Sequence, residues 1–277
     1  MKIFACSDLH SYFTPFKQAL NEKGFEPNNP DHLLVVCGDV FDRGSESIEI
    51  YEFLNNLTNV VLVRGNHEDL LVEILNRGYG ERHDHSNGTT GTVVDLVDIT
   101  GKNTTSSEEC CEAVKELIIP FLNKFLNYFE TKNYIFVHGW IPCDAGKQSR
   151  PWYQQGRKLK YNPDWRVCSN EEWEAARWIN GMAAGFVQKD KVLEPGKVIV
   201  CGHWHCSYGH YQKAVKDVII AGESIFDVAH DEFGDTACFE PFFAEGILAI
   251  DACTAHTGKV NVVVLEDELL DGTEEEK

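Results

Sequence analysis

Two stretches of sequence decide the fold: VVCGDVFDRG, at residues 35–44, and VVLVRGNHE, at residues 60–68. Each is a short apolar run that ends near a glycine and continues into residues able to bind metal ions or phosphate. This pattern is typical of a buried parallel strand followed by a tight loop, and open α/β sheets carry their sites at the carboxyl ends of strands. The two loops are one strand–helix–strand unit apart. We therefore expect convergence of Asp39, Asp42, Arg43, Asn66 and His67.

The composition is that of a globular protein with an unusual charge. The chain has 277 residues, of which 43% are hydrophobic and 25% charged, and this length suffices for one large domain with a sizeable core. The net charge of −19 argues against a nucleic-acid-binding surface, which needs a basic face. An anionic substrate would gain nothing from the overall field and would have to be held by local positive charge.

The ten cysteines do not form the pattern of a disulfide scaffold or a zinc site. No Cys-x-x-Cys spacing occurs, and Cys6, Cys37 and Cys201 each end an apolar run, where a small buried thiol fits. The first residues lead directly into a strand, without the features of a signal peptide, and no apolar run approaches the roughly 20 residues of a membrane span. We expect a cytoplasmic protein with free thiols and no membrane contact.

Strands and helices are predicted to alternate in the first part of the chain, whereas the last part is mostly strand. We predict strands at 3–6, 33–37, 60–63, 134–137, 198–201, 218–221, 246–250 and 260–265, and helices at 15–23, 45–56, 69–76, 108–128 and 170–180. Residues 78–107 are rich in Gly, Thr, Asn and Asp without a clear period, so 78–131 is interpreted as a cap-like insertion. We predict a single domain over 1–265 and a frayed acidic tail over 266–277.

Polar residues follow five of the predicted strands. They are Asp8, His10, Asp39, Asn66, His138, His203 and His205. Carboxylate, imidazole and amide ligands together suit Mn, Fe or Zn better than Ca or Mg, and one carboxylate can bridge two ions. Two ions about 3.5–4 Å apart can share an attacking hydroxide and clamp both ends of an in-line displacement at phosphorus. The nearby Arg43 could grip phosphate oxygens with two parallel hydrogen bonds.

The combined motifs resemble a known family. GDVFDRG at 38–44 and GNHE at 65–68, followed by His-Gly at 138 and Gly-His-x-His at 202–205, resemble the calcineurin-like metallophosphoesterases, and among them the phosphoprotein phosphatase family of serine/threonine phosphatases. The resemblance implies an α/β fold, a four-layer α/β/β/α sandwich, with two divalent metal ions between the loops of its two sheets. Manganese is the first expectation, and iron or zinc the alternative. The implied ligands are Asp8, His10 and Asp39 for one ion, and Asp39, Asn66, His138 and His203 for the other.

The same resemblance implies roles for the remaining residues. His67 would protonate the leaving oxygen, Asp42 would orient its imidazole, and Arg43 would bind the substrate phosphate. A second phosphate-binding arginine matches Arg177 by position, with Arg150, Arg157 and Arg166 as competitors. His205 could bind the first metal ion or support the site from outside it. Glu68 is predicted to be structural rather than a ligand.

Three functions follow from this site. The first is a phosphatase that acts on phosphoserine or phosphothreonine in proteins and peptides. The second is a hydrolase of small phosphoesters, most plausibly dinucleoside polyphosphates such as diadenosine tetraphosphate. Three motifs depart from the phosphatase pattern: SDLHS at 7–11, His-Gly-Trp at 138–140 and the Gly-His-x-His motif. The second function is disfavoured by the intact Asp-Arg-Gly and Asn-His-Glu motifs. The third, a non-catalytic scaffold, should show eroded ligands, and none is missing.

Overall fold

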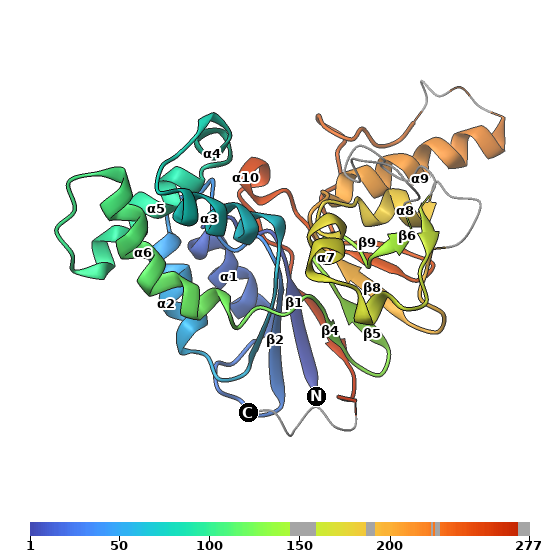
Figure 1. Cartoon of the computed structure of the whole chain (residues 1–277). Helices are drawn as coiled ribbons and strands as arrows, with labels where there is room; N and C mark the ends of the chain where they lie inside the picture. The colour runs from blue at the N-terminus through green and yellow to red at the C-terminus, as the bar shows by residue number, and fades with distance from the viewer. Residues whose placement is uncertain (145–158, 187–191, 223, 225–227, 271–277) are drawn as a thin grey trace.

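Two β-sheets lie face to face between two groups of helices in the computed structural model (Figure 1), which describes residues 1–144, 159–186, 192–222, 224 and 228–270. The first sheet has the order β11-β1-β2-β3, in which β1, β2 and β3 are parallel and β11 is antiparallel to β1. Its strands are β1 (Lys2–Cys6), β2 (His32–Cys37), β3 (Val60–Val63) and β11 (Val263–Glu266).

The second sheet has the order β4-β5-β8-β10-β9, with a parallel centre and antiparallel edges. Its strands are β4 (Phe129–Glu130), β5 (Tyr134–Phe136), β8 (Val198–Cys201), β9 (Phe242–Ala244) and β10 (Ile247–Ala249). A short ribbon pairs β6 (Cys143–Asp144) with β7 (Lys160–Tyr161). The predicted α/β class is confirmed.

Strand alternation divides the apolar side chains among three cores, and these three cores separate four layers. In β1, Phe4 and Cys6 face the helices of the first half, whereas Ile3 and Ala5 belong to a middle core. That middle core also contains Phe136 and Val200 from the second sheet. The remaining faces of β5, β8 and β10 pack in a third core with helices of the second half. Because side chains alternate between the two faces of a strand, one face of each sheet packs in the middle core and the other face packs against helices.

The helices cover the outer faces of the two sheets. On the first sheet lie α1 (Phe13–Lys23), α2 (Ser47–Asn56), α3 (Asn66–Arg77), α5 (Thr89–Val97) and α6 (Ser107–Leu122). On the second lie α7 (Asn170–Ala176), α8 (Gly181–Phe186) and α9 (Cys206–Ala221). The short elements are α4 (Arg82–Asn87), η1 (Asp98–Thr100), η3 (Trp165–Val167) and α10 (Thr254–Thr257).

One strand prediction is wrong. Residues 218–221 are the last turn of α9 and not a strand, because a four-residue apolar run does not distinguish a helix end from a strand. Residues 82–97 form α4 and α5, although their Gly and Thr content is unfavourable for helices. Val93 and Leu96 of α5 enter the same core as α1 and α2, so α5 packs in the first helical layer, whereas β4, at the end of segment 78–131, belongs to the second sheet. Packing overrides propensity here.

The C-terminal segment is tied to the second sheet further than expected. Residue 266 still belongs to β11, and the buried carboxylate of Asp267 accepts hydrogen bonds from Thr131 Oγ1 at 2.7 Å and from Asn133 N at 2.8 Å and Nδ2 at 2.6 Å. The prediction of fraying is wrong for residues 266–270, while 271–277 lie outside the described residues. Among the described helices, none is both long and apolar enough to cross a membrane.

Substituting Asp267→Ala should lower the free energy of unfolding by about 1–3 kcal/mol, because three donors lose a buried acceptor. Burial alone would raise the pKa of Asp267, but the hydrogen bonds from Thr131 and Asn133 hold it below its ordinary value of 3.8. The stabilisation is therefore present above that value and lost as the pH falls through the lower folded value. Denaturant titration at pH 7 should show the full difference from the parent chain, and a titration in acid a smaller one. Substituting the exposed neighbour Glu268→Ala should leave the midpoint unchanged, and equal midpoints for both variants would contradict this account.

Candidate metal centre

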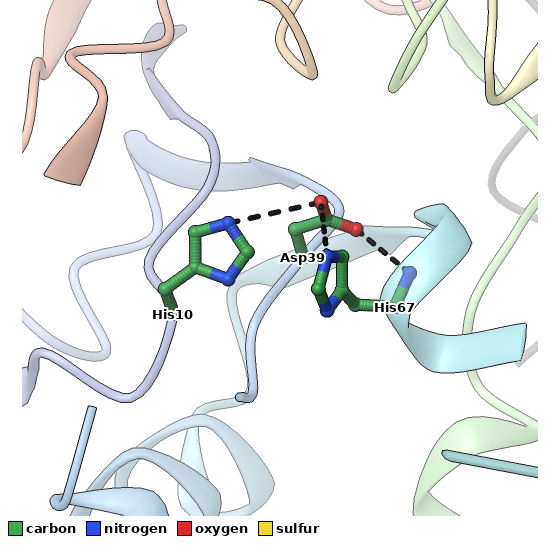
Figure 2. Close-up of side chains that lie close together, drawn as sticks. All are labelled: His10, Asp39 and His67. Carbon is green, nitrogen blue, oxygen red and sulfur yellow. Dashed lines mark hydrogen bonds and ion pairs between the residues drawn. The ribbon is translucent and has the colours of Figure 1, made fainter. Parts of the chain in front are cut away.

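The loops after five parallel strands meet between the carboxyl ends of the two sheets. The loop after β1 carries Asp8 and His10, the loop after β2 carries Asp39, and α3 begins directly with Asn66 and His67. The second sheet contributes His138 after β5 and His203 after β8. Figure 2 shows the side chains of His10, Asp39 and His67 directed toward one another from their three segments. The predicted convergence of strand ends is confirmed.

The backbone of these loops is held in an uncommon conformation. Asp8, His10, Asp39, Asp42 and His203 all have positive φ, between 49° and 77°, a region that residues with a Cβ seldom adopt. Hydrogen bonds between loops stabilise it, including one from Asp8 N to Gly38 O at 3.1 Å and one from His10 N to Asp39 O at 3.0 Å. Such clustered backbone strain is a feature of functional sites.

A glycine allows the two central loops to approach one another. Gly38 has φ +77°, and a Cβ at this position would lie 2.6 Å from the Cα of Gly65 and 2.6 Å from the imidazole of His138. No other residue would fit without moving a candidate ligand. The glycine before Asp39 in the sequence motif is therefore required by the space between the loops.

Two groups of ligand atoms share the carboxylate of Asp39. One group is His10, Asp39 and His67, and the other is Asp39, His138 and His203; within each, the ligand atoms lie within 4.8 Å of one another. Asp39 Oδ2 lies 3.9 Å from Nε2 of His10 and 3.9 Å from Nε2 of His67, and Oδ1 lies 3.3 Å from Nε2 of His138. The two groups are the arrangement expected if one carboxylate bridges two cations.

The surroundings of two imidazoles favour the neutral form, which is the form that binds metal ions. The Nδ1–H of His10 donates to the carbonyl oxygen of Phe41 at 3.1 Å, so its Nε2 keeps a lone pair that faces Asp39. Burial lowers the pKa of His10 well below its usual range, and burial together with the charge of His138 lowers the pKa of His203 to about 3. A backbone carbonyl on one ring nitrogen is a common way to fix the orientation of a metal ligand.

The surroundings of His138 favour the protonated form instead. Its Nδ1 lies 2.8 Å from the carbonyl oxygen of Cys37 and its Nε2 lies 2.8 Å from Asn66 Oδ1, so both ring nitrogens face acceptors. Burial would lower the pKa of His138, but the adjacent negative charge of Asp39 outweighs it and raises the pKa to about 10. A cation at this position would replace the Nε2 proton, as metal binding to histidine generally does.

Burial and neighbouring charges also shift the pKa values of the carboxylates of Asp39 and Asp8. Burial favours protonation of Asp39, but His138 and His67 overcome it and hold its pKa well below the usual range. Burial raises the pKa of Asp8 to about 6. Asp8 belongs to neither three-residue group, but its Oδ2 accepts the N–H of His203 at 2.9 Å, so it lies against the ligand loop of the second sheet.

The donor set fits divalent cations. Asp39 offers a buried anionic carboxylate to both groups, the neutral imidazoles offer free nitrogens, and Asn66 offers an amide oxygen. Mixed nitrogen and oxygen ligands of this kind suit first-row transition ions.

Glu68 supports the centre from below, as the sequence predicted. Its fully buried carboxylate accepts three backbone N–H groups, from Asp39 at 3.0 Å, Val40 at 2.8 Å and Gly65 at 2.7 Å. These bonds join the two central loops to one another. Glu68 is therefore structural, and its charge is used to position Asp39 rather than to bind an ion.

His67 lies between an acid partner and an arginine. Its Nδ1 lies 2.7 Å from Asp42 Oδ2, and its Nε2 lies 3.2 Å from Arg43 Nη2. Burial would lower the pKa of His67, but the charge of Asp39 and the hydrogen bond to Asp42 raise it above 6.5. Arg43 is exposed at the mouth of the site. The predicted Asp42–His67–Arg43 arrangement is present.

The structure does not bring Arg177 or His205 into either ligand group. Arg177 is 6% exposed, and its Nη1 and Nη2 donate to Asp69 at 2.7 Å and Asn127 at 2.6 Å. His205 Nε2 lies 2.9 Å from Glu232 Oε1. Among the competing arginines, Arg166 pairs with Glu130 and Glu194. Arg150 and Arg157 lie outside the described residues.

Sequence reasoning missed three polar residues of this region. Asp251 follows β10 as Asp39 follows β2, is 5% exposed, and has a pKa raised well above the usual range by burial and by the charge of Asp8. The pattern of an apolar strand followed by a carboxylate could have indicated it. Thr89 and Thr92 donate hydrogen bonds to Asp42 from a helix about 50 residues further on, and no local pattern indicates them.

Comparison with known proteins identifies the family. The model of the calcineurin-like phosphoesterase family matches residues 1–207, and the chain belongs to this family. It is similar to the symmetrical bis(5'-nucleosyl)-tetraphosphatase of Aromatoleum aromaticum, with 35% identity over 86 residues, 31% of each chain. The enzyme of the same name from Thioalkalivibrio sulfidiphilus is 39% identical over 75 residues, 27% of each chain. The match thus spans about a third of the length of these curated relatives.

One solved structure has a similar fold at low identity. A cold-active protein tyrosine phosphatase superposes with a TM-score of 0.50 and 14% identity, over 96% of this chain and 73% of that one. This likeness concerns the fold alone. The predicted superfamily is therefore confirmed, whereas the curated relatives carry a different name from the serine/threonine phosphatases that the motifs resemble.

Substituting Glu68→Ala should weaken Mn²⁺ binding by roughly 10- to 100-fold, the usual effect of removing a group that positions metal ligands. The reason is that three backbone N–H groups beneath Asp39 lose their acceptor. Isothermal titration of the purified chain with MnCl₂ measures the effect, and circular dichroism checks the fold. Substituting the surface residue Glu22→Ala is the matched control. Unchanged affinity in a folded Glu68→Ala protein would show that these hydrogen bonds do not position Asp39.

Proposed function

We propose that the protein is a metal-dependent phosphoester hydrolase whose substrates are dinucleoside polyphosphates, with diadenosine tetraphosphate as the compound to test first. One observation carries the substrate class: the relatives with 35% and 39% local identity are both named symmetrical bis(5'-nucleosyl)-tetraphosphatases. The family match and the shared-carboxylate geometry support the reaction class.

Two divalent ions would be held by the ligands that the strand ends supply. Asp8, His10 and Asp39 would hold one ion, and Asp39, Asn66, His138 and His203 the other, with manganese as the proposed metal. When bound, the ions would offset negative charge on the phosphoryl oxygens and make a water molecule nucleophilic at neutral pH. His205 is left out of this set because its Nε2 is engaged by Glu232.

The residues of this chain would bind the phosphate and move a proton. Arg43 presents an exposed guanidinium beside His67, which supplies the local positive charge that a chain with net charge −19 needs for an anionic substrate. His67 would give a proton from Nε2 to the leaving oxygen, while Asp42 holds the Nδ1–H and stabilises the imidazolium form. Arg177 is not part of the proposed binding site because Asp69 and Asn127 occupy its two terminal nitrogens.

A phosphoserine or phosphothreonine phosphatase is the second candidate. The observation that favours it is the intact GDVFDRG and GNHE motifs together with the 2.7 Å contact between His67 and Asp42. That contact suits a leaving serine or threonine oxygen, which needs a proton more than a nucleoside diphosphate does.

The test of the proposed function compares three substrates on one preparation. The manganese-reconstituted chain is assayed on diadenosine tetraphosphate, a phosphothreonine peptide and p-nitrophenyl phosphate, and kcat/KM is measured for each. We expect the highest value for the dinucleotide, with ADP as the nucleotide product. A preference for the phosphopeptide would transfer the proposal to the second candidate. Inactivity on all three with Mn²⁺, Fe²⁺ and Zn²⁺ would refute hydrolysis itself.

Substituting His67→Ala should lower kcat by roughly 10²- to 10⁴-fold on phosphate esters with alkyl leaving groups, because their oxygen must be protonated as it departs. On p-nitrophenyl phosphate the loss should be much smaller, since p-nitrophenolate leaves without a proton. Steady-state kinetics on both esters measures the difference, with exposed His256→Ala as the control. An equal loss on both esters would contradict the role of His67 as a proton donor.

Substitutions of the two arginines should have opposite consequences. Arg43→Ala should raise KM by about 10- to 100-fold, the loss of a charge-assisted hydrogen bond to phosphate, with little change in thermal stability. Arg177→Ala should instead lower the free energy of unfolding by about 1–3 kcal/mol, because the partly buried Asp69 and Asn127 lose the hydrogen bonds from this buried guanidinium. KM values and thermal melts of both variants measure this. A large KM effect of Arg177→Ala without destabilisation would restore Arg177 to the binding site.

A further inference from the structure

We infer that Thr89 and Thr92 of helix α5 are positioning residues for the proton transfer by His67, and that they act through the carboxylate of Asp42. This inference rests on the proposed role of His67. It assigns to α5, which lies outside the strand-end loops, an indirect part in the geometry of the reaction.

The hydrogen bonds engage both oxygens of Asp42. Thr89 Oγ1 donates to Asp42 Oδ2 at 2.7 Å, and Thr92 Oγ1 donates to Oδ1 at 2.8 Å. The Thr92 hydroxyl also accepts the backbone N–H of Asp42 at 3.1 Å. All three side chains are buried, with exposures of 0%, 1% and 0% for Thr89, Thr92 and Asp42, so water does not compete for these bonds.

The carboxylate cannot turn without losing a buried partner. Oδ2 accepts from both Thr89 and the Nδ1–H of His67, at 2.7 Å each, while Oδ1 is held by Thr92. A rotation about the Cβ–Cγ bond would break at least two of these contacts among buried side chains. The plane of the carboxylate therefore sets the direction in which the imidazole ring of His67 points.

The backbone conformation lets α5 lie directly against the turn at Asp42 and Arg43. Asp42 and Arg43 have φ of 77° and 64°, and Gly88, the residue directly before α5, has φ +88°. A Cβ on Gly88 would collide with the backbone nitrogen of Arg43. Glycine at this position lets the start of the helix lie directly against the Asp42–Arg43 turn.

Further along the same helix a third polar side chain, Asp95, is connected to the loop after β1 through Ser47, the first residue of α2. Asp95 Oδ2 accepts from Ser47 Oγ at 3.1 Å, and Ser47 lies 3.0 Å from Ser11 Oγ, in the loop after β1. Thr89, Thr92 and Asp95 are three residues apart, which places them along one side of the helix. Val93 and Leu96 of α5 enter the hydrophobic core, so apolar packing and these hydrogen bonds together hold the helix in place.

A positioning role differs from a merely structural one in what its loss would do. If the threonines only stabilise the fold, valine at these positions should reduce activity on all substrates alike. If they hold Asp42 for His67, the loss should be confined to substrates whose leaving oxygen needs a proton. Misplaced catalytic groups cost large factors in rate even when the displacement is small.

The test uses the full manganese-reconstituted chain with Thr89→Val, Thr92→Val and the double substitution, each matched by the serine variant that keeps the hydroxyl. We expect the double valine variant to lower kcat about 10-fold or more on alkyl phosphates and less than about 2-fold on p-nitrophenyl phosphate. The serine variants should restore most of the loss. In a His67→Ala background the valine substitutions should add little further loss, because their effect passes through His67.

A second readout does not depend on turnover. In the zinc-reconstituted chain with ¹⁵N-labelled histidine, the Nδ1–H signal of His67 should be observed in the parent and in Thr89→Ser, and broadened by solvent exchange in Thr89→Val. If the double valine variant does not fold, the single Thr89→Val variant carries both measurements. Uniform losses on all substrates, or full additivity with His67→Ala, would overturn the inference.

The two proposals fail in distinguishable ways. If the parent chain hydrolyses no phosphoester, the proposed function fails, and the NMR comparison alone still decides whether the threonines hold Asp42 and His67 in place. If the parent is active but the valine variants lose activity equally on every ester, only the positioning role fails.

Discussion

The rest of the site depends on the interactions of one buried carboxylate, that of Asp39. It is 2% exposed, accepts the backbone N–H of His67 at 3.0 Å, and is approached by the imidazoles of His10, His67 and His138. A carboxylate in such a place is costly unless positive or polar groups compensate it. Here the compensation comes from both sheets at once, so the position of this one charge determines how the loops of the two halves meet.

The fold makes this compensation possible. Parallel strands deliver their carboxyl ends to one edge of each sheet, and the middle core of Ile3, Ala5, Phe136 and Val200 aligns the two edges. Glu68 then joins the loops around Asp39 through three backbone N–H groups, and Asp8 joins them to the second sheet through the N–H of His203. This arrangement requires several residues with a left-handed backbone, which is a strained conformation. Hydrogen bonds between the loops, and glycines that let the loops lie close together, offset this strain.

Much of the centre could be predicted from the sequence because its information is local. Asp39, Asn66, His138 and His203 each follow an apolar strand directly, so strand prediction alone places them at one edge. The helix α5 could not be predicted in this way, since its Gly- and Thr-rich sequence forms a helix only through packing on α2, α3 and α6. Its contacts to Asp42 are long-range and leave no periodic trace. The hydrogen-bond partners of Arg177 could not be predicted for a similar reason, because Asp69 and Asn127 are far away in the chain.

The most direct test of the central claim is the stoichiometry of manganese binding to the Asp39→Asn variant, measured by equilibrium titration beside the parent chain. Removing the charge of a carboxylate that belongs to both ligand groups should weaken both ions together, so the parent should bind two Mn²⁺ per chain and the variant should lose high-affinity binding at both positions. A folded variant that still binds one ion with the affinity of the parent would show that Asp39 is not shared, and the account of the site would be wrong.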